Sequence, residues 1–244
     1  MSKPIYSMKN YVVKNDNKKV LNINKFDFHR GVCYVVSGKC SSGKTLFLDS
    51  LAGNLKTGEG LIKYEGTELS KMKKYQLAQE ICYMQQETRR GWGTAERYLV
   101  KYLSRYEHIS DIKKAYMNIL GKMDLKYMLP LKVRKLTMGQ FRLLQIVAAI
   151  AADTKVLIID GIDISVSQYE LTNIAKILYR KSHYDGVTVI LSCYNKSQLS
   201  KLGNVFIQFD AGRIVGIRSS DRRDDRRPRS RPRQRRKNNQ PKKS

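Results

Sequence analysis

The stretch "SGKCSSGKT" holds the residues of this chain whose types and spacing are most specific for chemistry. Gly38, Gly43, Lys44 and Thr45 satisfy the pattern GxxxxGK[ST], in which glycines let backbone N–H groups approach a chain of phosphates closely. The lysine supplies a positive charge for the terminal phosphates, and the threonine supplies a hydroxyl ligand for Mg²⁺. We therefore expect ATP and Mg²⁺ as cofactors. The predicted nucleotide-binding residues are Gly38, Lys39, Cys40, Ser41, Ser42, Gly43, Lys44 and Thr45.

A carboxylate that suits the same chemistry ends the run "KVLIID". Asp160 follows four apolar residues, and a carboxylate at the end of a buried strand can hold a metal ion through water. An aspartate on the surface is the alternative, but the apolar run before it argues against this. We therefore predict that Asp160 and Thr45 belong to one metal site.

The elements that position these residues follow from the spacing of apolar side chains. "CYVVSG", Cys33–Gly38, is rich in β-formers and runs directly into the glycine loop, and the leucine spacing after the loop predicts a helix that ends at Gly53. "KVLIID" and "VTVILS" are short β-branched runs, typical of buried parallel strands. Residues 110–124 have the pattern of an amphipathic helix. Strands that alternate with helices predict an α/β fold.

The order of further motifs resembles the nucleotide-binding domain of ABC ATPases, over nearly all of the chain except its C-terminal end. "ICYMQQ" is similar to the strand that ends in the family's Q-loop, "LTMGQ" to its LSGGQ signature, and "FDAGRIV" to its closing turn. The resemblance implies an α/β fold of the P-loop NTPase type with a mostly parallel sheet, an N-terminal antiparallel β subdomain and an inserted helical subdomain at about 88–138 in a domain of residues 1–218. It also implies that each signature covers the nucleotide of a second subunit. The signature residues are Leu136, Thr137, Met138, Gly139 and Gln140.

The departures from the family pattern concern hydrolysis. Gly161 stands where the family has its catalytic glutamate, Tyr194 where it has the switch histidine, and Met138 where the signature has a glycine. A general base contributes about 10²–10⁴ in rate, so we predict that ATP binding is kept and that hydrolysis is slow or partner-dependent. Gly161→Glu would then restore part of the rate. The resemblance assigns catalytic positions to Gln86, Asp160, Gly161 and Tyr194, and metal ligands to Thr45, Gln86 and Asp160.

Two assignments stay open at this point. Asp163, close to the missing glutamate, is an alternative general base, since geometry rather than residue type decides that role. The aromatic residue that the family places against adenine aligns with Asn15, but Tyr11 lies close to it in the sequence.

The only tryptophan marks a candidate interface. Trp92 stands in "RRGWGT", after Arg89 and Arg90, in the region where the family's membrane partner docks. An exposed aromatic residue beside arginines is typical of an interface anchor. Packing in the core under the inserted helices is the alternative, because tryptophan is usually well buried.

The chain is strongly basic. It has 47 Lys and Arg against 21 Asp and Glu, a formal net charge of +26. Residues 219–244 hold almost no apolar side chains, so we predict a disordered basic tail there. Such a polycation attracts an anionic membrane surface, nucleic acid or an acidic partner, and the sequence does not choose among them.

The cellular location that we expect rests on two features missing from the sequence, a membrane span and a secretion signal. No apolar run approaches the ~18–20 residues of a membrane span, and the first residues lack the apolar core of a secretion signal. The four cysteines are scattered and have no metal-binding spacing, which predicts reduced thiols. We expect a cytoplasmic protein, peripheral at the inner face of a membrane.

Two functions remain after these observations. The first is an ATP-binding ABC-type ATPase subunit that forms a homodimer, or a heterodimer with another ABC ATPase subunit, and couples to a separate integral membrane protein. The second is a nucleotide-controlled scaffold or nucleic-acid-binding protein that uses its basic surface and tail.

Overall fold

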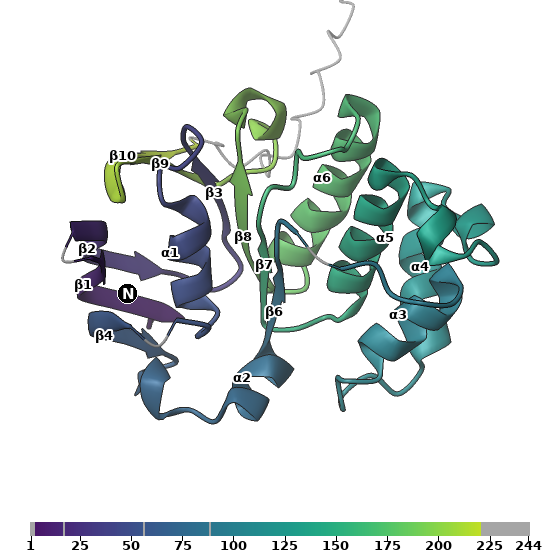
Figure 1. The fold of residues 1–244 in the computed structure, drawn as a ribbon, viewed down its shortest axis with the longest axis horizontal. Coiled ribbons are helices and arrows are strands. Elements are labelled where there is room, and N and C mark those ends of the chain that lie inside the picture. Colours follow the sequence, from purple (N-terminus) through teal and green to yellow (C-terminus); the bar gives the residue numbers. More distant parts are fainter. Residues whose placement is uncertain (1–2, 17, 56, 88, 221–244) are drawn as a thin grey trace, which may run out of the picture.

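In a computed structural model, which describes residues 3–16, 18–55, 57–87 and 89–220, the chain forms two β sheets (Figure 1). The larger sheet has the strand order β10-β9-β3-β8-β7-β6 and is parallel from β9 to β6. The smaller sheet is antiparallel, with the order β2-β1-β4-β5. The strands are β1 (Tyr6–Asn15), β2 (Lys18–Phe28), β3 (Cys33–Ser37), β4 (Gly58–Tyr64), β5 (Thr67–Glu68), β6 (Ile81–Met84), β7 (Val156–Ile159), β8 (Thr188–Cys193), β9 (Val205–Asp210) and β10 (Arg213–Ser219).

Helices lie on both faces of the six-stranded sheet (Figure 1). α1 lies between the two sheets, α5 and α6 cover the opposite face, and α3 and α4 pack outside α5. The helices are α1 (Lys44–Leu51), α2 (Lys74–Glu80), α3 (Ala95–Leu103), α4 (Ile112–Met123), α5 (Met138–Ala151) and α6 (Gln168–His183). Short 3₁₀ turns are η1 (Leu69–Lys71), η2 (Lys126–Met128), η3 (Val133–Lys135) and η4 (Lys196–Leu199).

The parallel strands are buried on both faces, which explains their nearly continuous apolar sequences. Because side chains alternate along a strand, Val35 and Leu157 join the core under α3–α6. Their neighbours Val36 and Ile158 join the core shared with α1 and the smaller sheet. The predicted α/β fold, with its mostly parallel sheet and its antiparallel β subdomain, is confirmed.

The amphipathic pattern at 110–124 forms α4, and the strands and helix predicted around the glycine loop are present as well. The Asp111 side chain caps α4 by accepting a hydrogen bond from the Lys114 N–H at 2.8 Å. Asp124 follows the last helical residue with a φ of +58°, a left-handed conformation that cannot continue the helix. Tyr116 and Ile119 are among the residues that face the core.

The folded part runs slightly past the boundary expected at 218. β10 continues to Ser219, and the Ser220 N–H donates to the Asn204 carbonyl oxygen at 2.8 Å. The rest of the predicted basic tail, residues 221–244, lies outside the described residues. The alternative scaffold or nucleic-acid function, which would use this tail together with the basic surface of the folded part, therefore stays a prediction.

Two further expectations concern thiols and membrane spans. All four cysteines are free, as predicted; Cys33, Cys82 and Cys193 are buried and Cys40 is exposed. Within the described ranges, no helix is both long enough and apolar enough to cross a membrane.

Candidate functional site

The glycine loop connects the end of β3 to the start of α1, as predicted. Gly43 has a φ of +96°, a conformation that glycine adopts far more readily than other residues, and α1 begins at the next position. A Cβ on Gly38 would approach the Phe209 carbonyl oxygen to 2.5 Å, so the close packing here also requires glycine. Lys44 Nζ donates to the carbonyl oxygens of Gly38 and Lys39, each at 2.8 Å. The lysine is thereby held within the loop.

Asp160 lies beneath the loop, directly after β7. The Thr45 hydroxyl donates to Asp160 Oδ2 at 2.7 Å, a contact between residues 115 positions apart. The Ser192 hydroxyl, near the end of β8, donates to the other carboxylate oxygen, and Asp160 is only 1% exposed. Hydroxyl and carboxylate oxygens are ligands that Mg²⁺ prefers, so this pair fits a magnesium site. In the described part of the chain, no three His, Cys, Asp or Glu residues gather as a candidate metal cluster.

A pocket of about 410 Å³ opens at the loop and brings together residues from several segments. It is lined by Val20, Cys40, Ser41, Ser42, Gly43, Lys44, Thr45, Leu46, Gln86, Gly161, Ser192 and Tyr194. The predicted residues Gln86, Gly161 and Tyr194 therefore meet the loop in one cavity. Ser192, Val20 and Leu46 were not predicted as site residues. A polar residue at the end of an apolar run could have indicated Ser192, whereas Val20 comes from the other sheet and carries no such signal.

Tyr194 contacts the loop lysine. Its ring centroid lies 4.9 Å from Lys44 Nζ, within the range of a cation–π interaction. Partial burial, with a smaller contribution from Cys40, raises the pKa of the Tyr194 phenol above its usual value. Because the phenol is therefore neutral at physiological pH, Tyr194 can donate a hydrogen bond to a phosphate but is a poor general base.

Gly161 has a backbone conformation that disfavours a glutamate. Its φ is +65°, and its N–H donates to Ser192 Oγ at 2.7 Å. Its carbonyl oxygen accepts from the Ile164 N–H at 3.1 Å, which closes a tight turn. A Cβ on this residue would lie 2.3 Å from Ile164 Cδ1. These contacts argue against the expectation that Gly161→Glu alone restores part of the hydrolysis rate.

Asp163, the alternative base, is engaged outside the pocket. Its Oδ2 accepts from the backbone N–H groups of Tyr194 and Asn195, at 2.8 and 3.1 Å, and so ties the turn after β7 to the loop after β8. The described residues that line the pocket include no aspartate and no glutamate. The other carboxylate oxygen of Asp163, Oδ1, is buried and has no hydrogen-bond partner among the described residues, so Asp163 as the base stays a prediction.

The sequence profile of a family described as "ABC transporter" matches residues 21–162, which is more than half of the chain and includes the loop, Gln86 and Asp160. The chain belongs to the ABC transporter family. It thus contains an ABC-type nucleotide-binding domain of the P-loop NTPase class, as the motifs predicted.

Curated relatives in this family are ATP-binding proteins of importers. The phosphonates import ATP-binding protein PhnC of Fusobacterium nucleatum is 22% identical over 229 residues, which cover 88% of this chain and 93% of the relative. The methionine import protein MetN of Lactobacillus johnsonii is 22% identical, with 85% of this chain and 62% of the relative covered. The arabinose import protein AraG of Escherichia coli O157:H7 is 24% identical, with 81% and 40% covered. The chain thus spans less than two thirds of MetN and of AraG.

Solved structures of ABC proteins have the same fold. An ATP-binding subunit of an ABC transporter superposes with a TM-score of 0.77 at 16% identity, covering 89% of this chain and 90% of the other. A dimeric ATP-binding cassette bound to ADP and Pi also gives a TM-score of 0.77, at 17% identity, covering 88% and 98%. At this level of identity the likeness establishes the fold alone.

The segment that resembles the ABC signature, residues 136–140, lies at the N-terminus of α5, outside the pocket of its own chain. Thr137 Oγ1 accepts from the Gln140 N–H at 3.2 Å and Gln140 Oε1 from the Thr137 N–H at 3.0 Å, a capping box that starts the helix. Leu136 is buried, whereas Met138 is 72% exposed. A Cβ on Gly139 would lie 2.9 Å from the Ser165 carbonyl oxygen, which explains a glycine there.

Neither candidate for the adenine platform lines the pocket. Asn15 is exposed at the end of β1, and Tyr11 is buried in the core of the β subdomain. From this subdomain only Val20 of β2 reaches the pocket, among the residues the structure describes.

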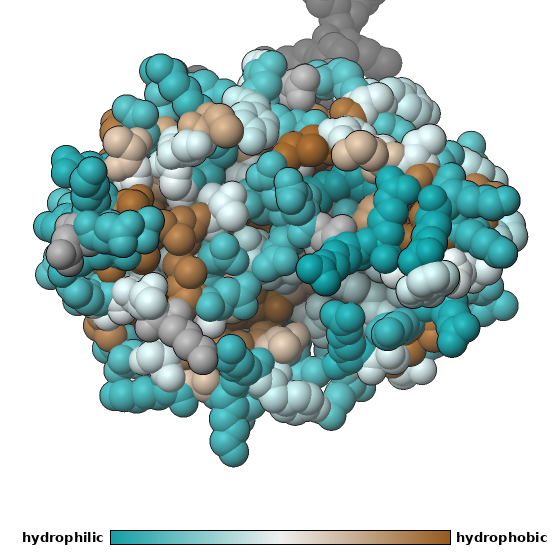
Figure 2. All heavy atoms as spheres, in the orientation of Figure 1, coloured by the Kyte–Doolittle hydropathy of each residue, from teal (hydrophilic) through white to brown (hydrophobic). Residues whose placement is uncertain are grey.

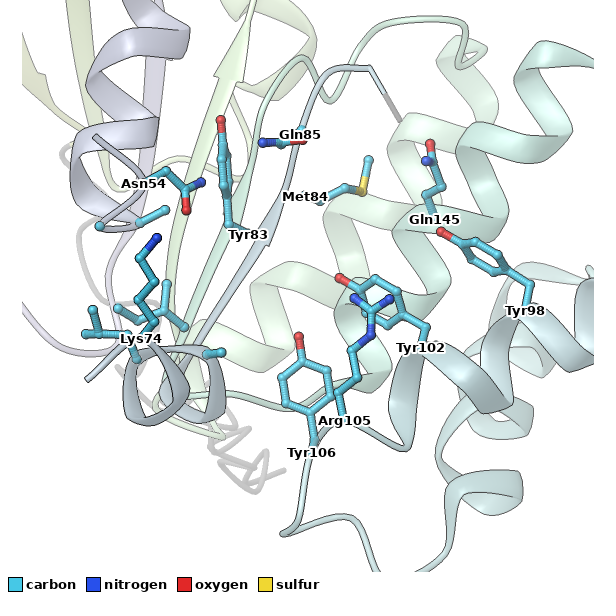
Figure 3. A pocket seen from close by; sticks show the side chains of 15 residues that line it. Asn54, Lys74, Tyr83, Met84, Gln85, Tyr98, Tyr102, Arg105, Tyr106 and Gln145 are labelled. Atoms are coloured by element: carbon cyan, nitrogen blue, oxygen red, sulfur yellow. The ribbon is translucent and has the colours of Figure 1, made fainter. Parts of the chain in front are cut away.

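A second concavity of this ABC domain, about 460 Å³ in volume, lies between α1 and α2 on one side and α3 and α5 on the other (Figure 3). We call it the tyrosine groove. It is lined by Ala52, Gly53, Asn54, Lys74, Leu77, Ala78, Ile81, Tyr83, Met84, Gln85, Tyr98, Tyr102, Arg105, Tyr106 and Gln145. Tyr102 and Arg105 lie on one wall, with the guanidinium 5.2 Å from the tyrosine ring, and face Asn54 and Tyr83 across it.

Trp92 is on the surface, so the alternative that it packs in the core is wrong. Its side chain is 78% exposed, and the Arg134 guanidinium lies 3.1 Å from its ring centroid. The Gly93 carbonyl oxygen accepts from the Val133 N–H at 2.9 Å, which fixes the turn that presents the tryptophan. An interface role remains a prediction.

Proposed function

We propose that this protein is the ATP-binding subunit of an ABC-type machine, which binds Mg-ATP at the glycine loop and couples to a separate integral membrane protein. The observation that carries the proposal is the contact between Thr45 and Asp160 beneath the loop, because a hydroxyl and a carboxylate are oxygen ligands that Mg²⁺ prefers. The names of the relatives, all ATP-binding proteins of importers, support the same function.

Each group in the pocket has a distinct role in this proposal. The N–H groups of the loop and Lys44 bind the phosphates, and the N-terminus of α1 adds a favourable dipole. Thr45, Asp160 and Gln86 hold the metal ion, which when bound neutralises phosphate charge. Tyr194 donates a hydrogen bond toward the terminal phosphate. With Gly161 in place of a base, hydrolysis is slow or depends on a partner subunit.

A second subunit would complete the site. The signature at the start of α5 lies outside its own pocket, and the N–H groups at a helix N-terminus are suited to bind phosphate. A dimer that places this segment over the nucleotide of the other subunit would use that capacity. Such a dimer has two copies of this chain or one copy with another ABC ATPase subunit.

The tyrosine groove is our candidate docking site for the membrane protein. The face shown in Figure 2 is mostly hydrophilic, with apolar side chains reaching the surface mainly in its left half and centre. The groove begins beside Gln85, so an inserted segment would lie next to Gln86 of the nucleotide pocket. The subunit would then sit on the cytoplasmic side of the membrane, held there by its partner.

Replacing Lys44 with alanine tests the binding step. We expect Lys44→Ala to weaken Mg-ATP binding by roughly 10- to 100-fold or more, because it removes charge-assisted hydrogen bonds to phosphate. Isothermal titration calorimetry measures the change, with Lys25→Ala on the exposed face of β2 as the matched control. Equal affinities for wild type and Lys44→Ala would contradict the assignment of the loop.

Replacing Met138 with glycine tests the dimer. The exposed Met138 side chain stands at the point where the signature would meet the nucleotide of a second subunit. We therefore expect Met138→Gly to increase the dimer fraction several-fold in the presence of Mg-ATP, measured by analytical ultracentrifugation. Tyr127→Ala, which removes another exposed apolar side chain, serves as the control. A smaller dimer fraction in Met138→Gly than in wild type would count against dimerisation through the signature.

A further inference from the structure

A buried arginine joins the signature helix to the nucleotide pocket, and neither the family motifs nor the spacing of charges singled it out. Arg142 lies in the second turn of α5 and is only 4% exposed. Its sequence context offers one signal, a single cation inside the run "FRLLQIVAAIAA", in which Gln145 is the only other polar residue.

The Arg142 guanidinium donates hydrogen bonds to four backbone carbonyl oxygens. One terminal nitrogen donates to Gln85 at 2.9 Å and to Gln86 at 3.1 Å. The other donates to Asp160 and, at 2.9 Å, to Gly161. The planar fork of an arginine suits several acceptors at fixed angles, whereas a lysine ammonium is a single point. The side chain therefore clamps two separate segments of backbone.

Arg142 binds these two backbone segments just beyond the point where the hydrogen bonds between β6 and β7 end. β6 and β7 are neighbouring parallel strands that end at Met84 and Ile159, and the Asp160 N–H still donates to the Met84 carbonyl oxygen at 2.9 Å. Beyond that bond the two chains leave the ladder, and Arg142 bridges them. The bridged residues include Gln86 and Asp160, which are the two proposed metal ligands that do not belong to the glycine loop.

Burial of this cation is unfavourable and needs compensation. Desolvation lowers the pKa of the Arg142 guanidinium to about 10, so the group remains charged at neutral pH. Its Nε is buried and has no hydrogen-bond partner among the described residues. An apolar side chain would fill the same space in the core without these penalties, so packing alone does not explain an arginine here.

We propose that Arg142 is a positioning residue for Mg²⁺, which holds the backbone of Gln86 and Asp160 so that both side chains face one metal position. The inference rests on the proposed function, in which this pocket binds Mg-ATP. The loop amides and Lys44 bind phosphate independently of the clamp. Arg142 therefore affects the contribution of the metal to ATP affinity more than the affinity for ATP itself.

The test compares ATP affinities with and without the metal. Calorimetry gives the dissociation constant of ATP in excess Mg²⁺ and in EDTA, for wild type, Arg142→Lys and Arg142→Gln. Loss of groups that orient metal ligands typically lowers metal affinity by about 10- to 100-fold. We call the dissociation constant of ATP in EDTA, divided by that in Mg²⁺, the EDTA-to-Mg²⁺ ratio, and we expect it to fall by the same factor in both variants. The affinity in EDTA should change by less than about threefold.

Controls separate this role from a structural one. Thermal unfolding identifies variants that fail to fold, and the glutamine variant, which keeps amide donors, provides a second chance of a folded protein. Arg90→Lys is the matched control, because Arg90 also donates to a backbone carbonyl, that of Leu136 at 2.6 Å, but lies outside the metal site. Electron paramagnetic resonance of Mn²⁺ bound with ATP reports directly on the metal's surroundings and should change only in the Arg142 variants.

Three results would overturn the proposal. If a folded Arg142 variant has the same EDTA-to-Mg²⁺ ratio as wild type, Arg142 does not position the metal ligands. Equal weakening in both conditions would show that it only supports the fold. Wild-type protein that binds ATP equally well in Mg²⁺ and EDTA, or does not bind it, would overturn the proposed function together with this inference.

Discussion

ATP turnover by the purified wild-type protein is expected to be about 10²- to 10⁴-fold below the ~1–10³ s⁻¹ that is common among enzymes. The described residues that line the pocket include no carboxylate that could orient and deprotonate water, and the neutral Tyr194 phenol is a poor substitute. The groups proposed to bind phosphate and metal are present, so we expect the pocket to bind Mg-ATP without hydrolysing it rapidly. Phosphate release at saturating Mg-ATP measures the rate.

The Lys44→Ala variant, which we expect to bind ATP weakly, gives the background rate of this assay. Fast turnover by wild type that disappears in this variant would show that another group activates water. Asp163→Asn would then identify or exclude the nearest candidate, whose carboxylate is held by the N–H groups of Tyr194 and Asn195. A rate that rises only when a second ABC subunit is added would indicate a partner-dependent site.

Replacing Gly161 with glutamate is expected to destabilise the protein and to leave turnover at the wild-type rate. A non-glycine residue held at a φ of +65° is strained, which lowers the free energy of unfolding by roughly 1–3 kcal/mol. The new Cβ would also lie 2.3 Å from Ile164 Cδ1, so the isoleucine side chain must shift. Urea unfolding followed by circular dichroism measures the loss of stability, and phosphate release measures the rate.

Two further variants separate strain from crowding. Gly186 has a φ of +72°, and a Cβ on this residue would meet no atom of the described residues within 4 Å, so Gly186→Glu should show the backbone strain alone. In Gly161→Glu with Ile164→Ala, the crowding is removed and part of the lost stability should return. A Gly161→Glu protein as stable as wild type, with faster turnover, would contradict our account of this position.

The glycine loop and its metal partner could be predicted because their requirements are largely local. A strand, a glycine-rich turn and a helix follow one another within a short stretch, and the positive φ of Gly43 is a requirement of that turn. The close contact that demands glycine at position 38 comes instead from the distant Phe209 carbonyl oxygen. The apolar run before Asp160 likewise indicates a buried strand whose end reaches the same edge of the sheet. Pairing of parallel strands then brings Thr45 and Asp160 into contact.

The fold class, the glycine loop and the absence of a glutamate at 161 could thus be read from the order of the residues alone. The exposure of Trp92, the burial of Tyr11 away from the pocket and the clamp made by Arg142 became apparent from the three-dimensional arrangement. Each of these depends on side chains and carbonyls from distant segments. The periodicity of a single segment reports which face is apolar, but it contains no information about which distant backbone oxygen a buried guanidinium will meet.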